Sequence, residues 1–300
     1  MPPYSFLDGP YRLAMGLRAL ELGEWLEAGP DAAGQMAERR RLLAERPAEV
    51  VAALPESMAA RHELFALVRE HLPRHFPDRW QQVGAELVDS ATGERFPPEP
   101  AEPMATLGRM VQEDFCLMQA SPEGYRLTAA VLCFPAHWRL ADKLGRPLDA
   151  IHEPVPGFDV RLARPVDRFF ASLQAERPVW RVNWSLVDTP ELFRPPAHRA
   201  RPKNIDTARA GEQMWLRVER QTLRRLPACG DVVFGIRTYV EPLVEVTADS
   251  AVARALAMRV REMPEDMATY KGIAPIRAPL LDYLEGRAAE SQSIEAIDAS

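Results

Sequence analysis

Cysteine is scarce in this 300-residue chain, and the three that occur rule out several kinds of site. Cys116, Cys133 and Cys229 lie far apart, and none belongs to a C-x-x-C pair. This spacing excludes a disulfide framework, a cysteine-rich zinc site and a four-cysteine iron–sulfur cluster within the chain. We expect each thiol to be buried or half-buried.

Long apolar runs and standard cofactor motifs are also missing. No uncharged apolar segment approaches the roughly 20 residues that span a bilayer, and the first residues lack the basic-then-apolar pattern of a signal peptide. The chain contains no G-x-G-x-x-G, G-x-x-x-x-G-K, H-E-x-x-H, G-x-S-x-G or C-x-x-C-H. We therefore expect a soluble, cytoplasmic protein without a Rossmann nucleotide site or covalently attached haem.

Glycine is outnumbered by proline, 16 to 28, which indicates stiff connecting loops and argues against one long helical bundle. The net charge of −6 provides no uniform positive field for nucleic acid or anionic lipid. With 47% apolar residues, the chain can build a substantial core, and disorder is excluded as the overall state.

The first eighty residues favour helices. A stripe at Leu13, Leu17 and Leu20 that continues to Trp25 predicts the first helix. A second helix follows Asp31 and ends near residue 46, and a third covers about 56–70.

Two features of these helices suggest sites that we do not favour. The run 39–41 is all arginine, and we place it on a solvated helix face near the negative end of the dipole. His71 and His75 are four residues apart, but Pro73 between them disfavours helix, so we expect them not to share a helical face or bind a metal.

The middle of the chain changes to strands. Alternation in 180–187 places Arg181 and Asn183 on one face, and parity places Glu219 with Arg217 and Gln221. Turn residues between consecutive segments indicate antiparallel pairs. The expected strands are 114–120, 125–134, 180–187, 214–226 and 231–246.

Beyond Asp249 the pattern returns to helix, and residues 287–300 form a polar tail. Clustered strands joined by turns, with helices at both ends, predict an α+β fold around an antiparallel sheet.

The segment 133–158 is the most unusual, because Pro135, Pro147, Pro154 and Pro156 stiffen it at intervals. A rigid loop suits a metal ligand, since rotamer freedom is already lost before coordination. His152 in this segment is thus either a ligand or an ordinary hydrogen-bonded loop histidine, and the pattern alone favours the latter.

Four segments resemble the family of haem-dependent oxidative N-demethylases, the dimethylamine monooxygenase-like proteins. They are DGPYRLAMGLRAL near the start, WRLADKLGRPLDAIHEPVPGF, RVNWSL, and LRVERQTLRRLP followed by FGIRTY, within about residues 8–240. The resemblance implies a PAS-like antiparallel sheet core with N-terminal and C-terminal helices that binds haem b without covalent attachment. It implies one such domain over 1–286, with a helical N-terminal extension and the polar tail 287–300.

The resemblance also implies an activity and its site. The family uses dioxygen to convert a small secondary alkylamine such as dimethylamine to the primary amine and formaldehyde. His152 becomes the candidate iron ligand, with His137 second. Neutral imidazole is a good ligand for haem iron. Lys143 and Arg146 are candidates for the haem propionates, although exposed loop charges explain them equally well. The candidate distal residues are Glu219, Arg237 and Arg181, for which cross-strand ion pairs are the competing interpretation.

Oxygen activation consumes electrons, and the chain carries no dinucleotide or iron–sulfur motif of its own. The family implies a separate NADPH-dependent flavin and iron–sulfur reductase chain. The alternatives are a haem-binding PAS-like sensor or carrier without catalytic activity, and a haem-free structural or interaction protein that has lost activity. A sensor would normally be coupled to an output domain, which these 300 residues do not show.

Overall fold

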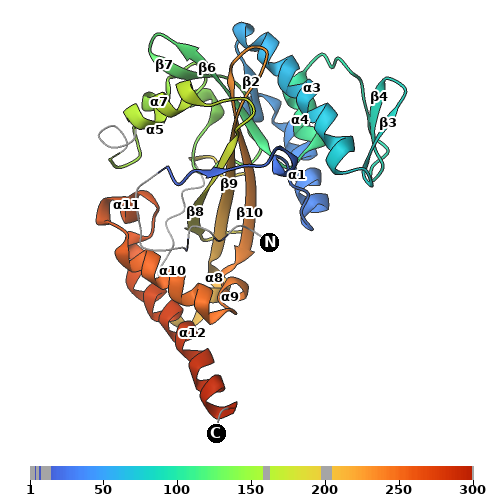
Figure 1. Cartoon of the computed structure of the whole chain (residues 1–300). Coiled ribbons are helices and arrows are strands. Elements are labelled where there is room, and N and C mark those ends of the chain that lie inside the picture. The colour runs from blue at the N-terminus through green and yellow to red at the C-terminus, as the bar shows by residue number, and fades with distance from the viewer. Residues whose placement is uncertain (1–3, 5–6, 8–14, 158–162, 197–204, 299–300) are drawn as a thin grey trace.

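A seven-stranded antiparallel sheet forms the centre of the fold in the computed structural model, which describes residues 4, 7, 15–157, 163–196 and 205–298 (Figure 1). The expected α+β class and antiparallel sheet are thus confirmed. The strand order is β1-β8-β9-β10-β6-β7-β2. The strands are β1 (Arg18–Ala19), β2 (Val51–Ala53), β6 (Asp114–Ser121), β7 (Gly124–Val131), β8 (Val179–Val187), β9 (Trp215–Arg225) and β10 (Val232–Pro242).

The five long strands lie within the predicted segments to within a few residues, and the two predicted pairs are confirmed. The predicted last strand is wrong at its end, because 243–246 form helix α9 and not strand. Strands β6 and β7 form the expected hairpin, closed by Ser121 opposite Gly124. Strands β9 and β10 pair along their whole length, from Trp215 opposite Pro242 to Arg225 opposite Val232. Because side chains alternate between the faces of a strand, this register fixes which polar residues meet.

One face of the sheet packs against helices from the N-terminal part of the chain (Figure 1). Phe115 and Leu117 of β6 share a core with Leu42, Leu64 and Leu107 from these helices. The helical elements before the hairpin are η2 (Leu22–Glu24), α1 (Ala32–Glu45), α2 (Pro47–Val50), η3 (Pro55–Ser57), α3 (Met58–His75) and α4 (Pro103–Met110).

The opposite face is crossed by the connection between β7 and β8. Leu140 and Leu148 of that connection pack on Cys116, Leu223 and Ile236 of the sheet. Its helical elements within the described residues are η4 (Leu140–Asp142), α5 (Leu148–His152) and α7 (Ala163–Ser172).

A third core joins the C-terminal helices to the far ends of β8 and β9, with Leu216 and Val218 packed against Leu256 and Leu280. The Asp249 carboxylate caps α10 by accepting from the amide of Ala251 at 2.8 Å. The last helix continues beyond residue 286. These elements are η6 (Thr207–Arg209), α8 (Ala210–Gln213), α9 (Leu243–Val246), α10 (Ser250–Glu262), α11 (Glu265–Tyr270), η7 (Ala274–Ile276) and α12 (Arg277–Asp298).

The predicted first helix is wrong over its described part. Gly16 has φ of 60° and Glu21 is extended, so Leu17 and Leu20 do not lie on one helix. Arg18 instead begins β1, which pairs with β8. Trp25 is fully buried, and Leu13 lies outside the described residues.

Two expectations about α1 and α3 are also wrong. Of the arginine run 39–41, only Arg40 and Arg41 are near solvent. Arg39 is fully buried and pairs with Asp114 at 2.7 Å, so the expected solvated face does not include it. Helix α3 runs through Pro73, and the rings of His71 and His75 stack with centroids 4.2 Å apart. The Phe76 amide still donates to Leu72 at 2.8 Å, so packing of the buried helix end outweighs the missing proline donor.

A small separate sheet projects beside α3 and α4 (Figure 1), made of β3 (Trp80–Val83), β4 (Glu86–Asp89) and β5 (Arg95–Phe96). Cys116 and Cys133 are buried as expected, whereas Cys229 is exposed. Among the described residues, no helix has the length and apolar character that crossing a membrane requires.

Candidate functional site

Polar side chains of β8, β9 and β10 gather on the sheet face that the β7–β8 connection crosses. Asn183, Glu219 and Thr238 lie opposite one another in the register of the three strands. Arg181 is two residues from Asn183 and therefore shares its face. This group, together with Lys143, His152 and Lys271 described below, is called the polar face.

His152 ends α5 and is half-buried. Its Nδ1 is 2.8 Å from the carbonyl oxygen of Leu148, one helical turn earlier. Burial, assisted by the charges of Lys143 and Arg181, lowers the pKa of His152 to about 4. The ring is therefore neutral near pH 7, and donation from Nδ1 leaves the lone pair on Nε2, the nitrogen that coordinates metals in this tautomer.

Lys143 follows η4 and lies close to this histidine. Its Nζ is 4.5 Å from the centre of the Trp138 ring, and burial lowers its pKa although the charges of Cys116 and Asp142 oppose the shift. Arg146, three residues later, is exposed. Of the two cations predicted for the propionates, only Lys143 is thus placed at the polar face.

Glu219 is held by several donors. Its carboxylate accepts from Gln221 Nε2 at 3.0 Å and from Asn183 Nδ2 at 3.3 Å, and it pairs with Arg217 Nε at 3.5 Å. Arg217 is almost fully buried and also donates to the carbonyl oxygen of Phe134 at 2.7 Å. The carboxylate of Glu219 is therefore fixed in position and faces several cations.

Lys271, directly after α11, is a residue of the polar face that sequence reasoning missed. Its Nζ donates to Asn183 Oδ1 at 3.3 Å and to the carbonyl oxygen of Trp184. Burial lowers its pKa to about 8, with Glu219 opposing and Arg181 assisting the shift. No motif marks this lysine, because it reaches the sheet only through the packing of the C-terminal helices.

Arg181 also has a lowered pKa, again through burial and against the attraction of Glu219. Its Nε is buried, and no residue within the described ranges accepts a hydrogen bond from it. The structure thus brings together His152, Lys143, Arg181 and Glu219 of the predicted site residues.

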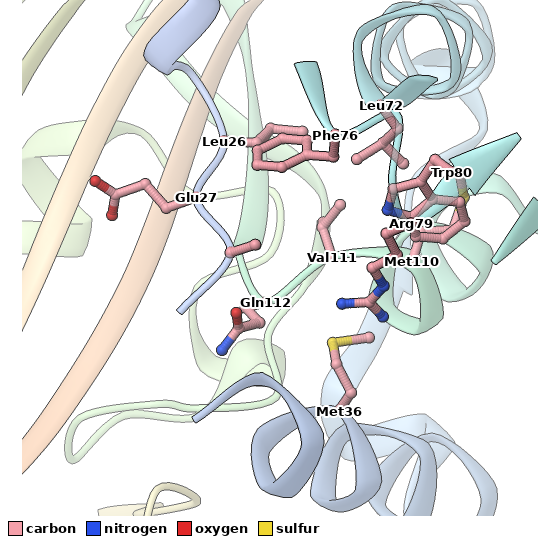
Figure 2. A pocket seen from close by; sticks show the side chains of 11 residues that line it. Leu26, Glu27, Met36, Leu72, Phe76, Arg79, Trp80, Met110, Val111 and Gln112 are labelled. Atoms are coloured by element: carbon pink, nitrogen blue, oxygen red, sulfur yellow. The ribbon is translucent and has the colours of Figure 1, made fainter. Parts of the chain in front are cut away.

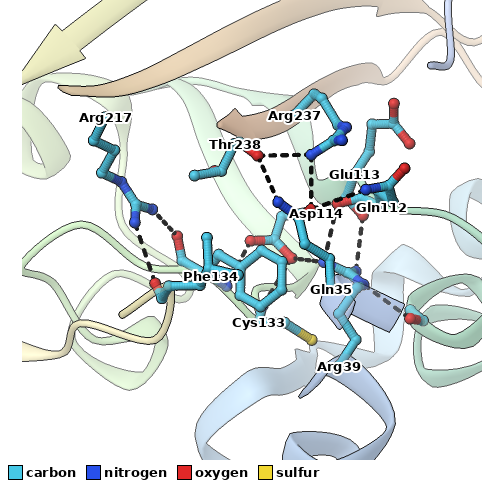
Figure 3. Close-up of polar contacts among 12 residues, drawn as sticks. Gln35, Arg39, Gln112, Glu113, Asp114, Cys133, Phe134, Arg217, Arg237 and Thr238 are labelled. Atoms are coloured by element: carbon cyan, nitrogen blue, oxygen red, sulfur yellow. Dashed lines mark hydrogen bonds and ion pairs between the residues drawn. The ribbon is translucent and has the colours of Figure 1, made fainter. Parts of the chain in front are cut away.

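Arg237 is not part of the polar face. It neighbours Thr238 in β10, so its side chain points to the opposite face of the sheet. There Nη1 donates to Gln35 Oε1 at 2.7 Å (Figure 3). Nη2 pairs with Asp31 at 2.6 Å. Arg237 therefore forms a structural ion pair, which was the competing interpretation of this residue.

A buried network around Asp114 connects the two faces (Figure 3). Its carboxylate accepts from Arg39 at 2.7 Å and from the amides of Cys133 and Phe134, both at 2.8 Å. Phe134 in turn accepts from Arg217, the partner of Glu219. The network therefore anchors the start of the connection that carries Lys143 and His152.

His137, the second candidate ligand, lies early in that connection and has φ of 63°, a left-handed conformation that is rare outside glycine. Its amide donates to the carbonyl oxygen of Arg194 at 2.7 Å. Within the described ranges, no three His, Cys, Asp or Glu side chains are grouped to hold a metal ion.

Figure 2 shows a small depression between α1, α3 and the segment before α1. Apolar side chains such as Met36 and Phe76 line it, with Glu27, Arg79 and Gln112 as polar members. It contains no predicted site residue and belongs to the N-terminal helical layer, so we assign it no role in the site.

Comparison with known families gives one match that covers most of the chain. Residues 16–281 match the sequence model described as haem-dependent oxidative N-demethylase, alpha subunit-like. The matched range includes every residue of the polar face.

Proposed function

The chain belongs to the haem-dependent oxidative N-demethylase alpha subunit-like family, and from this premise we propose that it demethylates a small secondary alkylamine at a non-covalently bound haem b. In the proposed reaction, dioxygen, two electrons and two protons convert a dimethylamine-like substrate to the primary amine, formaldehyde and water. The haem supplies the activation of dioxygen when it is bound. The electrons come from a separate NADPH-dependent flavin and iron–sulfur reductase chain.

The side chains of the polar face have the chemistry that holds a haem, and the neutral, oriented ring of His152 is the observation that carries the proposal. A haem ligand must be neutral and oriented, and the ring has both properties through its lowered pKa and its contact with Leu148. Lys143 offers a desolvated ammonium for a propionate. We do not include Arg146 or Arg237, because one is exposed and the other lies on the opposite face.

Glu219 is the residue we assign to the amine. Its carboxylate accepts a hydrogen bond from the N–H of the substrate and can hold a proton released from it. Gln221 and Asn183 keep that carboxylate oriented by donating to it at 3.0 and 3.3 Å. The covering connection between β7 and β8 limits the access of water to this face.

The arrangement of strands supports a PAS-like core. Numbered along the chain from β6, the five long strands lie in the order second, first, fifth, fourth, third, with the covering helices between the second and third. This order is typical of a PAS-like sheet. We propose that residues 1–286 form one such domain with a helical N-terminal extension, and that 287–300 extend beyond it.

The proposal is tested by the absorption spectrum of the purified chain. We expect a Soret band that shifts with carbon monoxide, a spectral change on adding dimethylamine, and formaldehyde release when reductant is supplied. His152→Ala should abolish or strongly weaken haem retention, whereas His62→Ala, at an exposed position, should not. Unchanged haem content in His152→Ala would remove His152 as the ligand and promote His137. Haem binding without amine response or turnover would favour a sensor or carrier.

A further inference from the structure

Two cations of the polar face have donors that the chain itself does not use. Arg181 Nε is buried without an acceptor among the described residues. Lys271 makes two hydrogen bonds through Nζ, to Asn183 and Trp184, whereas an ammonium carries three donors. Buried donors in proteins are rarely left without partners, so a ligand is the natural acceptor.

The two side chains belong to one locality although they are 90 positions apart. Lys271 Nζ contacts Asn183, which shares the face of β8 with Arg181 two residues earlier. Each is within electrostatic range of Glu219, and the charge of Arg181 acts on Lys271. The mutual repulsion of two desolvated like charges destabilises the ligand-free fold.

Glu219 does not neutralise this pair. Its carboxylate accepts from Gln221 and Asn183 and already pairs with Arg217, which is itself a cation. The polar face thus contains more positive than negative charge. An added anion would restore the balance.

We propose that Arg181 and Lys271 form a carboxylate-binding site. A carboxylate has two oxygens in a plane, which match the planar guanidinium and leave a lone pair for the third donor of the ammonium. Two sources offer this chemistry, a propionate of the haem or a carboxylate on an N-methylated amine substrate. The assignment to either source rests on the proposed function, while the carboxylate site itself rests on the unused donors.

The direct test uses the full chain prepared without added haem. Acetate and N-methylglycine are titrated while the Arg Nε–H resonances are followed by ¹⁵N NMR. Binding should shift the Arg181 resonance, and Arg181→Gln and Lys271→Gln should each weaken binding at least about tenfold, as expected for a lost charge-assisted hydrogen bond. Arg177→Gln, an exposed cation just before β8, is the matched control and should bind like the wild type.

The second arm distinguishes the sources by comparing haem with its dimethyl ester, which lacks ionised propionates. If Arg181→Gln weakens binding of haem at least about tenfold but leaves the ester unaffected, the carboxylate is a propionate. If both porphyrins bind as in the wild type while N-methylglycine binding is lost, the carboxylate belongs to the substrate. Wild-type affinity of both variants for haem, acetate and N-methylglycine overturns the proposal.

Melting temperatures provide an independent check. Removing an unpaired buried charge should leave the melting temperature of the ligand-free chain unchanged or higher, as is common for residues kept for binding. A lower melting temperature in Arg181→Gln together with unchanged ligand binding would assign the residue a structural role. If the wild type binds acetate but no haem, the proposed function fails and the carboxylate site stands.

Discussion

Asp114→Asn tests whether the buried network between the two sheet faces supports the fold. Asp114 is fully buried and faces the Arg39 guanidinium at 2.7 Å, with no exposed surface on either side chain beyond 1%. The asparagine has nearly the same shape but no charge. In the carboxylate, Oδ1 accepts from the amide of Cys133 and Oδ2 accepts from the amide of Phe134, so replacing one oxygen by an NH₂ group leaves one of these backbone donors without an acceptor.

The expected loss follows from the contacts. Removing one partner of a buried ion pair costs about 3–5 kcal/mol, because the remaining charge stays desolvated. Arg39 keeps three carbonyl acceptors, Gly108 at 2.9 Å, Gln112 at 3.3 Å and Glu113 at 2.8 Å. Because these carbonyls still stabilise its charge, we take the lower end of that range, about 3 kcal/mol, for the broken ion pair. One of the amides of Cys133 and Phe134 loses its acceptor, which adds about 1 kcal/mol. We expect a total of about 4 kcal/mol.

Urea unfolding followed by tryptophan fluorescence measures this loss as a lower midpoint at unchanged slope. The double variant Arg39→Met, Asp114→Asn should lose less than the sum of the single variants, since the stranded charge is gone. Arg41→Met, which breaks only exposed ion pairs with Glu38 and Glu45, should change little. A loss below about 1 kcal/mol for Asp114→Asn, or full additivity, would refute the reasoning.

Two further predictions concern pH and packing. Burial lowers the pKa of His71 to about 4, so between pH 6.5 and 4 the unfolded chain binds a proton that the folded chain does not, and stability falls as pH falls. His71→Leu should flatten the decline in unfolding free energy from pH 7 to 5, and an unchanged pH profile would contradict the assignment. In β10, a Cβ at Gly235 would lie 2.6 Å from Thr222 Oγ1, so Gly235→Ala should cost about 1–3 kcal/mol in urea unfolding. A fully stable Gly235→Ala variant would show that the strands can separate there.

Much of the sheet could be predicted because its long strands carry strong local patterns. Alternation in β8 and turn residues after β6 and β9 depend only on neighbours in sequence, and all three predictions are confirmed. Strands β1 and β2 contain two and three residues, too few for a period to show. They exist because they pair with the long strands, a contact that local pattern does not contain.

Residues of the site could be predicted from the sequence only where they lie in one element or follow the alternation of side chains along one strand. The placement of Arg237 on the opposite face from Glu219 depends on the register of β9 with β10, in which Glu219 lies opposite Thr238, so the expected grouping of these two residues is wrong. The grouping of Glu219 with Arg217, by contrast, follows from parity within β9 and was contained in the sequence. The burial of Arg39 was not, because its partner Asp114 lies 75 residues away. Lys271 was missed for the same reason, since its contacts with Asn183 and Trp184 span 88 and 87 residues.

The long separation between Arg181 and Lys271 has a consequence for biosynthesis. During translation the sheet strand that carries Arg181 emerges first, and the lysine follows only when the C-terminal helices have been made. A nascent chain that stops before α11 therefore presents half of the carboxylate site. Binding of an acidic ligand at these two residues therefore requires the segment that carries Lys271, and truncations that spare every long strand of the sheet still impair it.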